Sequence, residues 1–191
     1  MKDLSLHILD IAQNSITAGA RRLDLELAEE NGQITLTVTD DGRGMAPELL
    51  ARVCDPFTTT RTTRKVGLGL PLLRLTAEQT GGSLSIDSTL GVGTTLTARF
   101  QRRHLDCPPL GDLPGAVALL IQGSPDMELT YRHTTPKGEA ALSTAELRDI
   151  LGDISLAEPE VFAWIQDYLT EQENEVAVDA SPTAVSEGEV Q

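Results

Sequence analysis

Residues 36 to 70 combine two glycine-rich turns with a short run of cations, a pattern suited to holding phosphate. The first turn, DDGRG, follows an alternating apolar segment and occupies residues 40 to 44; the second, GLGL, begins another apolar run at residues 67 to 70. Glycine lets a backbone pass close to a ligand because it has no β-carbon, and the free N–H groups at a helix start suit an anion. The stretch therefore indicates a nucleotide pocket.

The loop between the two turns, DPFTTTRTTRKV, adds positive charge. Arg61, Arg64 and Lys65 are three of the fifteen basic residues of the chain and fall within five consecutive positions. In a protein with a net charge of −14, this concentration favours attraction of the roughly four negative charges of a nucleoside triphosphate. The alternative is an ordinary solvated loop.

A second group of polar residues lies near the N-terminus. Apolar residues recur at spacings of three or four over residues 4 to 18, which predicts a helix that ends at Gly19. Asp10 and Asn14 are four residues apart and so lie one turn apart on another face of this helix. An oxygen ligand on a rigid helix suits a hard cation that keeps most of its waters.

These motifs together resemble those of a known family. The segments DIAQNSITAGA, DDGRGM, DPFTTTR, GLGL and GVGT follow one another in the order of the asparagine box and glycine boxes of the Bergerat-fold ATPases. That superfamily includes the catalytic domains of histidine kinases, type II topoisomerases, the ninety-kilodalton heat-shock chaperone and the mismatch-repair ATPase. The resemblance covers residues 1 to 103 and, because the lid segment is short, is strongest to the histidine kinases.

The resemblance implies ATP and Mg²⁺ as ligands and assigns roles to individual residues. Asn14 would ligate the magnesium ion, Asp40 would accept a hydrogen bond from the exocyclic amine of adenine, and Asp10, Asn14 and Arg61 would be catalytic. The complete set implied to contact the nucleotide is Asn14, Asp40, Gly42, Gly44, Phe57, Thr59, Thr60, Arg61, Arg64, Lys65, Gly67, Leu68, Gly69, Leu70 and Thr94.

Asp10 departs from the family pattern. The ATP-hydrolysing members carry a glutamate there, so this carboxylate is one methylene shorter, and it is alternatively a solvated helix residue. The second acidic residue that follows the asparagine in the mismatch-repair type is replaced by Thr17. Both differences argue against an efficient hydrolase.

The surrounding elements predict an α/β sandwich. Residues 22 to 28 and 33 to 39 alternate apolar and polar side chains around Asn31-Gly32, which is a strong hairpin signal. A short helix is expected at 46–53 and a longer one after GLGL, and two more strands at 83–88 and 93–100. We expect a mixed, largely antiparallel sheet of at least four strands, covered on one face by helices.

The remainder of the chain is predicted to form an extension of unknown role, residues 104–170, and a disordered acidic tail, residues 171–191. After a linker or tight connection at 104–115, the pattern predicts a helix at 116–123 and strands at 127–133 and 138–143. A helix capped by Ser143 or Thr144 and another from Pro159 follow. The extension either continues the sheet or forms a separate lobe that recognises a partner.

Composition narrows the setting of the protein. Twenty-nine acidic against fifteen basic side chains argue against a nucleic-acid partner. No apolar run approaches the ~20 residues of a membrane span, and Asp3 lies where a signal peptide would be basic, so we expect a cytoplasmic protein without a membrane partner. Cys54 and Cys107 have neither disulfide nor metal-site spacing and are interpreted as reduced structural thiols.

Three functions remain compatible with the sequence. Only nine residues precede Asp10, so no phosphoacceptor domain is expected before the ATP site, and the first hypothesis is a kinase that transfers the γ-phosphoryl group to a separate protein. The second is a binding switch that regulates a partner through the extension and is operated by ATP. The third is an inactive nucleotide-binding scaffold. The oligomeric state is open.

Overall fold

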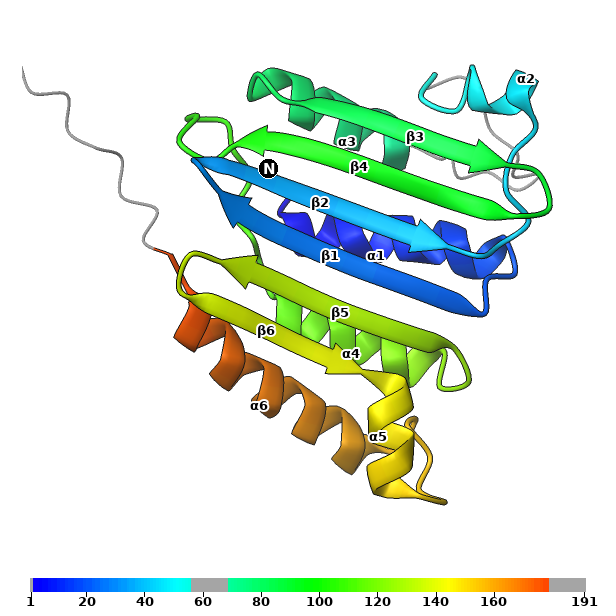
Figure 1. The fold of residues 1–191 in the computed structure, drawn as a ribbon, viewed down its shortest axis with the longest axis vertical. Coiled ribbons are helices and arrows are strands. Elements are labelled where there is room, and N and C mark those ends of the chain that lie inside the picture. The colour runs from blue at the N-terminus through cyan, green and yellow to red at the C-terminus, as the bar shows by residue number, and fades with distance from the viewer. Residues whose placement is uncertain (1, 56–68, 179–191) are drawn as a thin grey trace, which may run out of the picture.

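The computed structural model describes residues 2–55 and 69–178, and the elements follow the order in Figure 1. They are α1 (Leu4–Thr17), β1 (Arg22–Glu30), β2 (Gln33–Asp40), α2 (Pro47–Leu50), α3 (Gly69–Gln79), β3 (Ser83–Thr89), β4 (Gly93–Gln101), α4 (Leu113–Gly123), β5 (Glu128–Thr135), β6 (Gly138–Ser143), α5 (Thr144–Leu151) and α6 (Pro159–Val176).

The described strands form one six-stranded sheet in the order β3-β4-β2-β1-β5-β6. All neighbouring pairs are antiparallel except β1 and β5, which run parallel. The helices α1, α3 and α4 lie behind the sheet in Figure 1, and α6 lies along the edge strand β6 and packs against α4. The predicted fold class, a mixed and largely antiparallel sheet covered on one face by helices, is confirmed.

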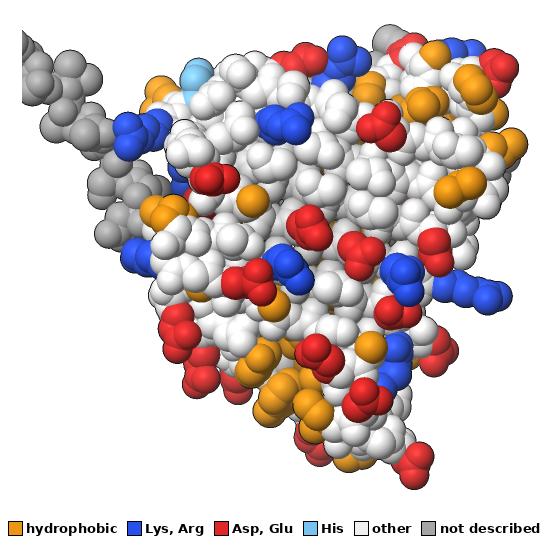
Figure 2. All heavy atoms as spheres, in the orientation of Figure 1, with side chains coloured by type: hydrophobic (Ala, Val, Ile, Leu, Met, Phe, Trp, Pro, Cys, Tyr) orange, Lys and Arg blue, Asp and Glu red, His pale blue; other side chains and the backbone are white. Residues whose placement is uncertain are grey.

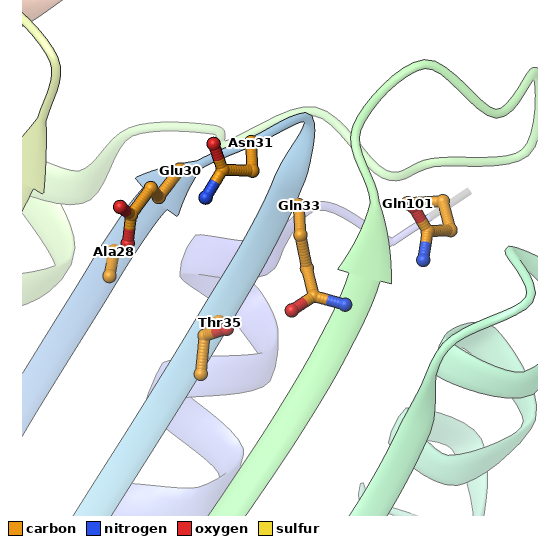
Figure 3. Close-up of a pocket in the computed structure, with 6 residues that line it drawn as sticks. All are labelled: Ala28, Glu30, Asn31, Gln33, Thr35 and Gln101. Carbon is orange, nitrogen blue, oxygen red and sulfur yellow. The ribbon is translucent and has the colours of Figure 1, made fainter.

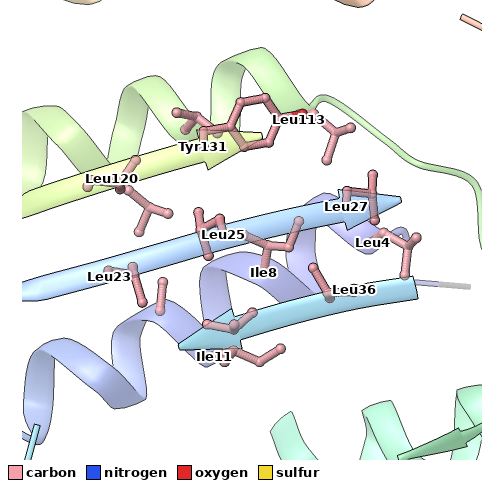
Figure 4. Packing of buried hydrophobic residues seen from close by; sticks show 14 of the residues in the cluster. Leu4, Ile8, Ile11, Leu23, Leu25, Leu27, Leu36, Leu113, Leu120 and Tyr131 are labelled. Atoms are coloured by element: carbon pink, nitrogen blue, oxygen red, sulfur yellow. The ribbon is translucent and has the colours of Figure 1, made fainter. Parts of the chain in front are cut away.

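The alternation of side chains along the strands creates the core. Leu23, Leu25 and Leu27 of β1 point to the helices and are at most 1% exposed, and they meet Ile8 and Ile11 of α1 in one cluster (Figure 4). The intervening positions of the strands are polar and face solvent. Figure 2 shows this open face of the sheet, where acidic and basic side chains are interspersed without forming one charged patch. The helix side of the sheet is therefore where a buried site can form.

The extension continues the sheet. Its strand β5 pairs with β1 from Arg22↔Glu128 to Ala28↔Thr134, and β6 then forms the edge. The connection before it packs tightly against α1, because Leu4 N–H donates to the Pro109 carbonyl at 2.9 Å. Of the two predicted arrangements, a continued sheet or a separate lobe, the structure has the first.

Several predicted boundaries are wrong. The helix predicted at 46–53 is limited to α2, and α4 begins before residue 116 because Asp112 Oδ1 accepts from Gly115 N–H at 2.9 Å and caps it. The predicted disorder from residue 171 is wrong up to Val176, since α6 continues to that residue. Neither predicted capping residue caps α5: the Ser143 side chain makes no cap hydrogen bond, and Thr144 Oγ1 instead accepts from Leu129 N–H at 2.8 Å.

A buried charged cluster ties the extension to the rest of the sheet. His133 of β5 lies between two carboxylates: its Nδ1 is 2.7 Å from Glu173 Oε2 on α6, and its Nε2 is 3.3 Å from Glu29 Oε1 on β1. Tyr131 Oη donates to the other oxygen of Glu173 at 2.6 Å, and Arg102 Nε lies 3.0 Å from the other oxygen of Glu29. We call these five residues the His133 cluster.

Candidate functional site

Asp40 is held at the C-terminal end of β2 by two donors from different segments. Ser15 Oγ, buried on α1, donates to Asp40 Oδ2 at 2.6 Å, and Gly42 N–H donates to Oδ1 at 2.9 Å. Each carboxylate oxygen has a second lone pair after these bonds. The carboxylate is therefore fixed in direction and still able to accept a hydrogen bond from a ligand.

Asp41 closes the turn against the start of β1. Its Oδ1 accepts from Arg21 N–H at 2.7 Å and from Arg22 N–H at 2.8 Å. These backbone hydrogen bonds, that of Arg22 above all, lower the pKa of the Asp41 carboxyl. Sequence reasoning assigned no role to Asp41 or to Ser15. Asp41 is the second of two acidic residues at the end of a predicted strand. This position was an available signal, because an Asp side chain at a turn readily accepts hydrogen bonds from nearby backbone N–H groups.

Two glycines allow the turn to pack against the neighbouring strands. Gly44 has φ +65°, and a β-carbon there would lie 2.0 Å from the Thr89 carbonyl oxygen. Gly93 has φ +145°, and a β-carbon there would lie 2.0 Å from the Asp40 carbonyl oxygen. Both close approaches are between backbone segments of the chain itself, so the glycines fix the position of the Asp40 turn whatever they contribute to a ligand.

Thr94 lies opposite Asp40 in the β2–β4 register. Its hydroxyl is 2.8 Å from Ser88 Oγ, which also accepts from Met45 N–H at 2.9 Å. Thr94 is thereby connected to the residues that follow the Asp40 turn. The structure brings Asp40, Gly42, Gly44 and Thr94 together at one end of the sheet, and their contact with a nucleotide stays a prediction.

The predicted residues of α1 lie beside the start of α3. Asn14 is exposed on α1, and Asp10 lies one turn before it. A β-carbon on Gly69 would be 3.4 Å from Asp10 Cβ, so the start of α3 passes directly by this side chain. Leu70 packs against the core from the next position. Asp10 therefore lies on the side of α1 that faces the start of α3, and Asn14 follows it one turn later along the helix.

Asp10 is paired with a cation. Its Oδ2 forms an ion pair with the Nζ atom of Lys2, and both side chains are partly exposed. The contact occupies one of the two carboxylate oxygens and holds the side chain towards Lys2. This contact adds to the shorter reach of Asp10 as a reason to doubt a water-activating role.

The remaining predicted contacts lie outside the described residues. They are Phe57, Thr59, Thr60, Arg61, Arg64, Lys65, Gly67 and Leu68. Their roles remain predictions.

A polar hollow of about 260 Å³ lies at the opposite end of the same strands (Figure 3). Its lining residues are Ala28, Glu30, Asn31, Gln33, Thr35 and Gln101. In the β1–β2 register Glu30 pairs with Gln33 at the hairpin, whereas Asp40 pairs with Leu23 at the other end. The hollow is therefore separate from the candidate site by the length of the strands.

Within residues 2–55 and 69–178, no group of three or more His, Cys, Asp and Glu side chains is placed to hold a metal ion. The one protein ligand predicted for Mg²⁺ is the amide oxygen of Asn14, and its exposure suits an ion that keeps most of its ligands as water and phosphate oxygens. In the same ranges, no helix combines the length and apolar character needed to cross a membrane.

Comparison with known proteins identifies the family. The sequence model of the histidine kinase-, DNA gyrase B- and HSP90-like ATPases matches residues 2–104, just over half of the chain. The chain belongs to this family. The matched residues include α1, the Asp40 turn, the second glycine turn and Thr94, so the resemblance on which the sequence prediction rested is confirmed.

The curated relatives include a heme sensor protein and a sensor histidine kinase. The chain is 33% identical over 96 residues to the heme sensor protein HssS of Staphylococcus saprophyticus, and 34% identical over 93 residues to the sensor histidine kinase ZraS of Salmonella typhimurium. These matches cover 50% and 47% of this chain. The chain spans only about a fifth of the length of either relative, the covered share being 20%.

Among solved structures, the crystal structure of the N-terminal domain of a DNA repair protein aligns with a TM-score of 0.52 at 17% identity. The alignment covers 75% of this chain and 53% of that one. At this identity the likeness concerns the fold alone. The nucleotide-free catalytic domain of the histidine kinase ThkA aligns over 50% of this chain and 64% of its own, with a TM-score of 0.42 at 21% identity.

Proposed function

We propose that the chain binds Mg²⁺-ATP at the Asp40 end of the sheet and transfers the γ-phosphoryl group to a side chain of a separate protein. The observation that carries the proposal is the fixed Asp40 carboxylate, held by Ser15 Oγ and Gly42 N–H. A carboxylate fixed in this way can accept from the exocyclic amine of adenine and rejects guanine, which presents a carbonyl there. A nucleotide without the exocyclic amine leaves the Asp40 carboxylate unpaired, so its binding lacks the free energy of a charged hydrogen bond.

The helix side supplies the phosphate end of the site. Asn14 would hold Mg²⁺, which when bound neutralises phosphate charge and leaves the γ-phosphorus open to attack. The start of α3 beside Asp10 would present backbone N–H groups to the phosphates. In the transfer, the bond between the γ-phosphorus and the β–γ bridging oxygen breaks, ADP leaves, and a new bond forms to the acceptor side chain.

Two features support the proposal. The position of Asp10 argues against hydrolysis, and the burial of two histidines argues for an acceptor on another protein. The Asp10 side chain is one methylene shorter than that of a glutamate and is held towards Lys2, which limits its reach to an attacking water molecule. His7 and His133 are each only 1% exposed, so neither can reach a phosphoryl group without unfolding of its surroundings. His104 is exposed, so a control must test whether it accepts the phosphoryl group.

The test follows γ-labelled ATP with the pure protein alone and then with extract of its own cells, recording protein-bound label and free phosphate together. We expect label on a second protein, and roughly ten- to a hundredfold less label with Asp40→Asn, since one charged hydrogen bond is worth about 1.5–3 kcal/mol. The matched control is Asp24→Asn, which removes the same charge from the open face and should transfer normally.

The other outcomes are equally informative. Label on the chain itself that disappears in His104→Gln would place the acceptor within this protein. Free phosphate without labelled protein would contradict transfer and establish a hydrolase. Equal labelling by Asp40→Asn and the wild type would remove Asp40 from the site.

A second function, a binding switch operated by ATP, is favoured by one observation. The Asp41 carboxylate holds the first residues of β1, and Arg22 of that strand pairs with Glu128, the first residue of β5. Nucleotide-dependent movement of the Asp40 turn would thus reach the extension through a single strand. The switch predicts different partner affinity with ATP and ADP, measured on the isolated complex; equal affinities would exclude it.

A further inference from the structure

The outer side of α6 carries an exposed pair of aromatic side chains. Trp164 is 49% exposed and Tyr168 36%, and their rings stack with centroids 5.0 Å apart and planes inclined by 11°. The chain contains one Trp, two Tyr and three Phe, so a third of its aromatic side chains stand together in solvent on one helix. Trp and Tyr are the residue types most enriched at the centres of protein interfaces.

The pair lies on the flank of α6 beside the edge of the sheet. Val161, Ile165 and Leu169 form the buried side of the helix. Gln172, one turn beyond Tyr168, accepts a hydrogen bond from the backbone N–H of Ala141 in the edge strand β6 at 2.9 Å. Figure 2 shows hydrophobic side chains gathered over α6 at the lower margin of the molecule. An approaching chain can therefore reach both rings.

Acidic residues surround the pair. Glu160 is four residues before Trp164, Asp167 three residues after it, and Glu171 three residues after Tyr168, and all three are exposed. Such spacings place side chains next to one another on a helix surface. Figure 2 shows acidic side chains around the hydrophobic ones at this margin.

The surrounding sequence holds almost no compensating positive charge. Residues 144–178 contain nine carboxylates and a single basic residue, Arg148. The guanidinium of Arg148 donates to the carbonyl oxygens of Pro125 and Met127 at 2.9 and 2.8 Å, so it is committed to the backbone. The surface around the rings is therefore both apolar and negatively charged.

We propose that this surface, which we call the α6 face and define by Trp164, Tyr168, Glu160, Asp167 and Glu171, docks a basic amphipathic segment of a partner protein. The apolar side of that segment packs on the stacked rings, while its Lys and Arg side chains contact the carboxylates and the ring faces. A second copy of the chain would bring like charges together, and an anionic membrane surface would be repelled in the same way. The docking role goes beyond phosphoryl transfer and does not depend on it.

The test uses the full chain and a synthetic peptide of about 18 residues, made of Leu and Lys with all Leu on one helical face, carrying a fluorescent label. Binding is followed by anisotropy at about 0.15 M ionic strength, where long-range attraction is screened. We expect Trp164→Ala/Tyr168→Ala to weaken binding at least about tenfold, because buried aromatic anchors dominate such interfaces. The matched control Leu105→Ala removes a side chain that is 94% exposed elsewhere, and should bind as the wild type does.

A second pair of variants separates a specific site from general attraction to an acidic protein. Glu160→Gln/Asp167→Asn/Glu171→Gln should weaken binding several-fold and reduce its salt dependence. Asp24→Asn/Glu26→Gln/Glu30→Gln removes the same charge from β1 on the open face and should leave affinity unchanged. An equal loss in both triple variants, or no loss in the aromatic variant, would overturn the proposal.

Trp164 is also an internal probe, since it is the only tryptophan of the chain. Peptide docked on the α6 face should shift its emission to shorter wavelength, and binding without a shift would locate the peptide elsewhere and contradict the proposal. Sedimentation that shows a dimer abolished by the aromatic variant would assign the face to a second copy, and binding to anionic vesicles lost in that variant would assign it to a membrane. Circular dichroism and ATP affinity of each variant should match the wild type.

Discussion

Asp40 and the pair Glu29 and Glu173 are two partly or fully buried carboxylate sites of the fold, and their surroundings differ. Asp40 is only partly buried, its donors are the neutral Ser15 Oγ and Gly42 N–H, and it can still accept from a ligand. Glu29 and Glu173 instead share the His133 cation between them and are further bound by Arg102 and Tyr131. The first carboxylate is prepared for a ligand, whereas the other two are satisfied within the fold.

This difference separates function from stability. Asp40 belongs to a turn whose contacts involve α1 and the ends of three strands. Its hydrogen-bond donors are neutral, so removing the charge of Asp40 leaves no buried cation without a partner. The His133 cluster connects β1, β5, α6 and the residue after β4, so its loss should weaken the packing of the extension against the rest of the fold. The predictions below test whether the two sites can be disrupted independently.

The largest effect is expected from His133→Ala. The substitution leaves Glu29 and Glu173 without their shared cation, and breaking a buried ion pair in this way typically lowers the free energy of unfolding by about 3–5 kcal/mol. Urea denaturation followed by Trp164 emission on α6 and by circular dichroism would measure it. ATP affinity at low temperature, where the variant is folded, should be unchanged. Asp40→Asn should show the reverse, a loss of ATP affinity with little loss of stability. A large loss of stability in Asp40→Asn would mean that the two sites cannot be disrupted independently.

The pH dependence of stability gives a second, smaller separation. Burial lowers the pKa of His133, but its hydrogen bonds to Glu173 and Glu29 outweigh burial and raise the pKa to about 9. Because the folded protein holds this proton more tightly than the unfolded chain, the stabilisation is complete below about pH 6.5. It should decline as pH rises towards 9, by about 1–3 kcal/mol.

The measurement is urea denaturation at intervals between pH 6.5 and 9, compared with His133→Ala over the same range. Burial raises the pKa of the Cys54 and Cys107 thiols. Their contribution to the free energy of unfolding therefore also falls as pH rises, but mainly above about pH 9. The lowered pKa of Asp41 acts on the acid side, below the range measured. A slope in the wild type that persists in His133→Ala would assign the effect to another group.

The two sites also differ in how far sequence could predict them. The Asp40 site is built from short motifs whose order and glycines are visible in the chain, and the structure places Asp40, Gly42, Gly44 and Thr94 together as those motifs indicate. Its supporting contacts were missed because they are long-range: Ser15 lies 25 residues from Asp40. A serine on a helix gives no sign of such a partner.

The His133 cluster left no sequence signal at all. His133 is a lone histidine in an alternating strand, and its bond to Glu29 spans 104 residues. Glu173 was assigned to a disordered acidic tail on composition. The segment is helical because it has specific partners: Gln172 binds the Ala141 N–H, Glu173 binds His133, and the Val176 carbonyl accepts from Thr135 Oγ1 at 2.7 Å. Tertiary contacts of this kind outweigh the tendency of an acidic segment to remain unfolded.

The smallest expected effect, that of Ser15→Ala, sharpens the comparison most. The variant removes the hydroxyl that donates to Asp40 Oδ2 but leaves the carboxylate, its charge and the Gly42 N–H contact in place. If Asp40 acts by its direction, ATP affinity measured by calorimetry should fall about three- to tenfold, equivalent to roughly 1 kcal/mol for one hydrogen bond. Thr17→Ala is the matched control, because its hydroxyl on the same helix donates only to the Gln13 carbonyl in the described contacts. Unchanged affinity in Ser15→Ala, with stability lowered, would mean that this hydrogen bond serves the fold alone and that Asp40 is less different from the buried glutamates than its geometry indicates.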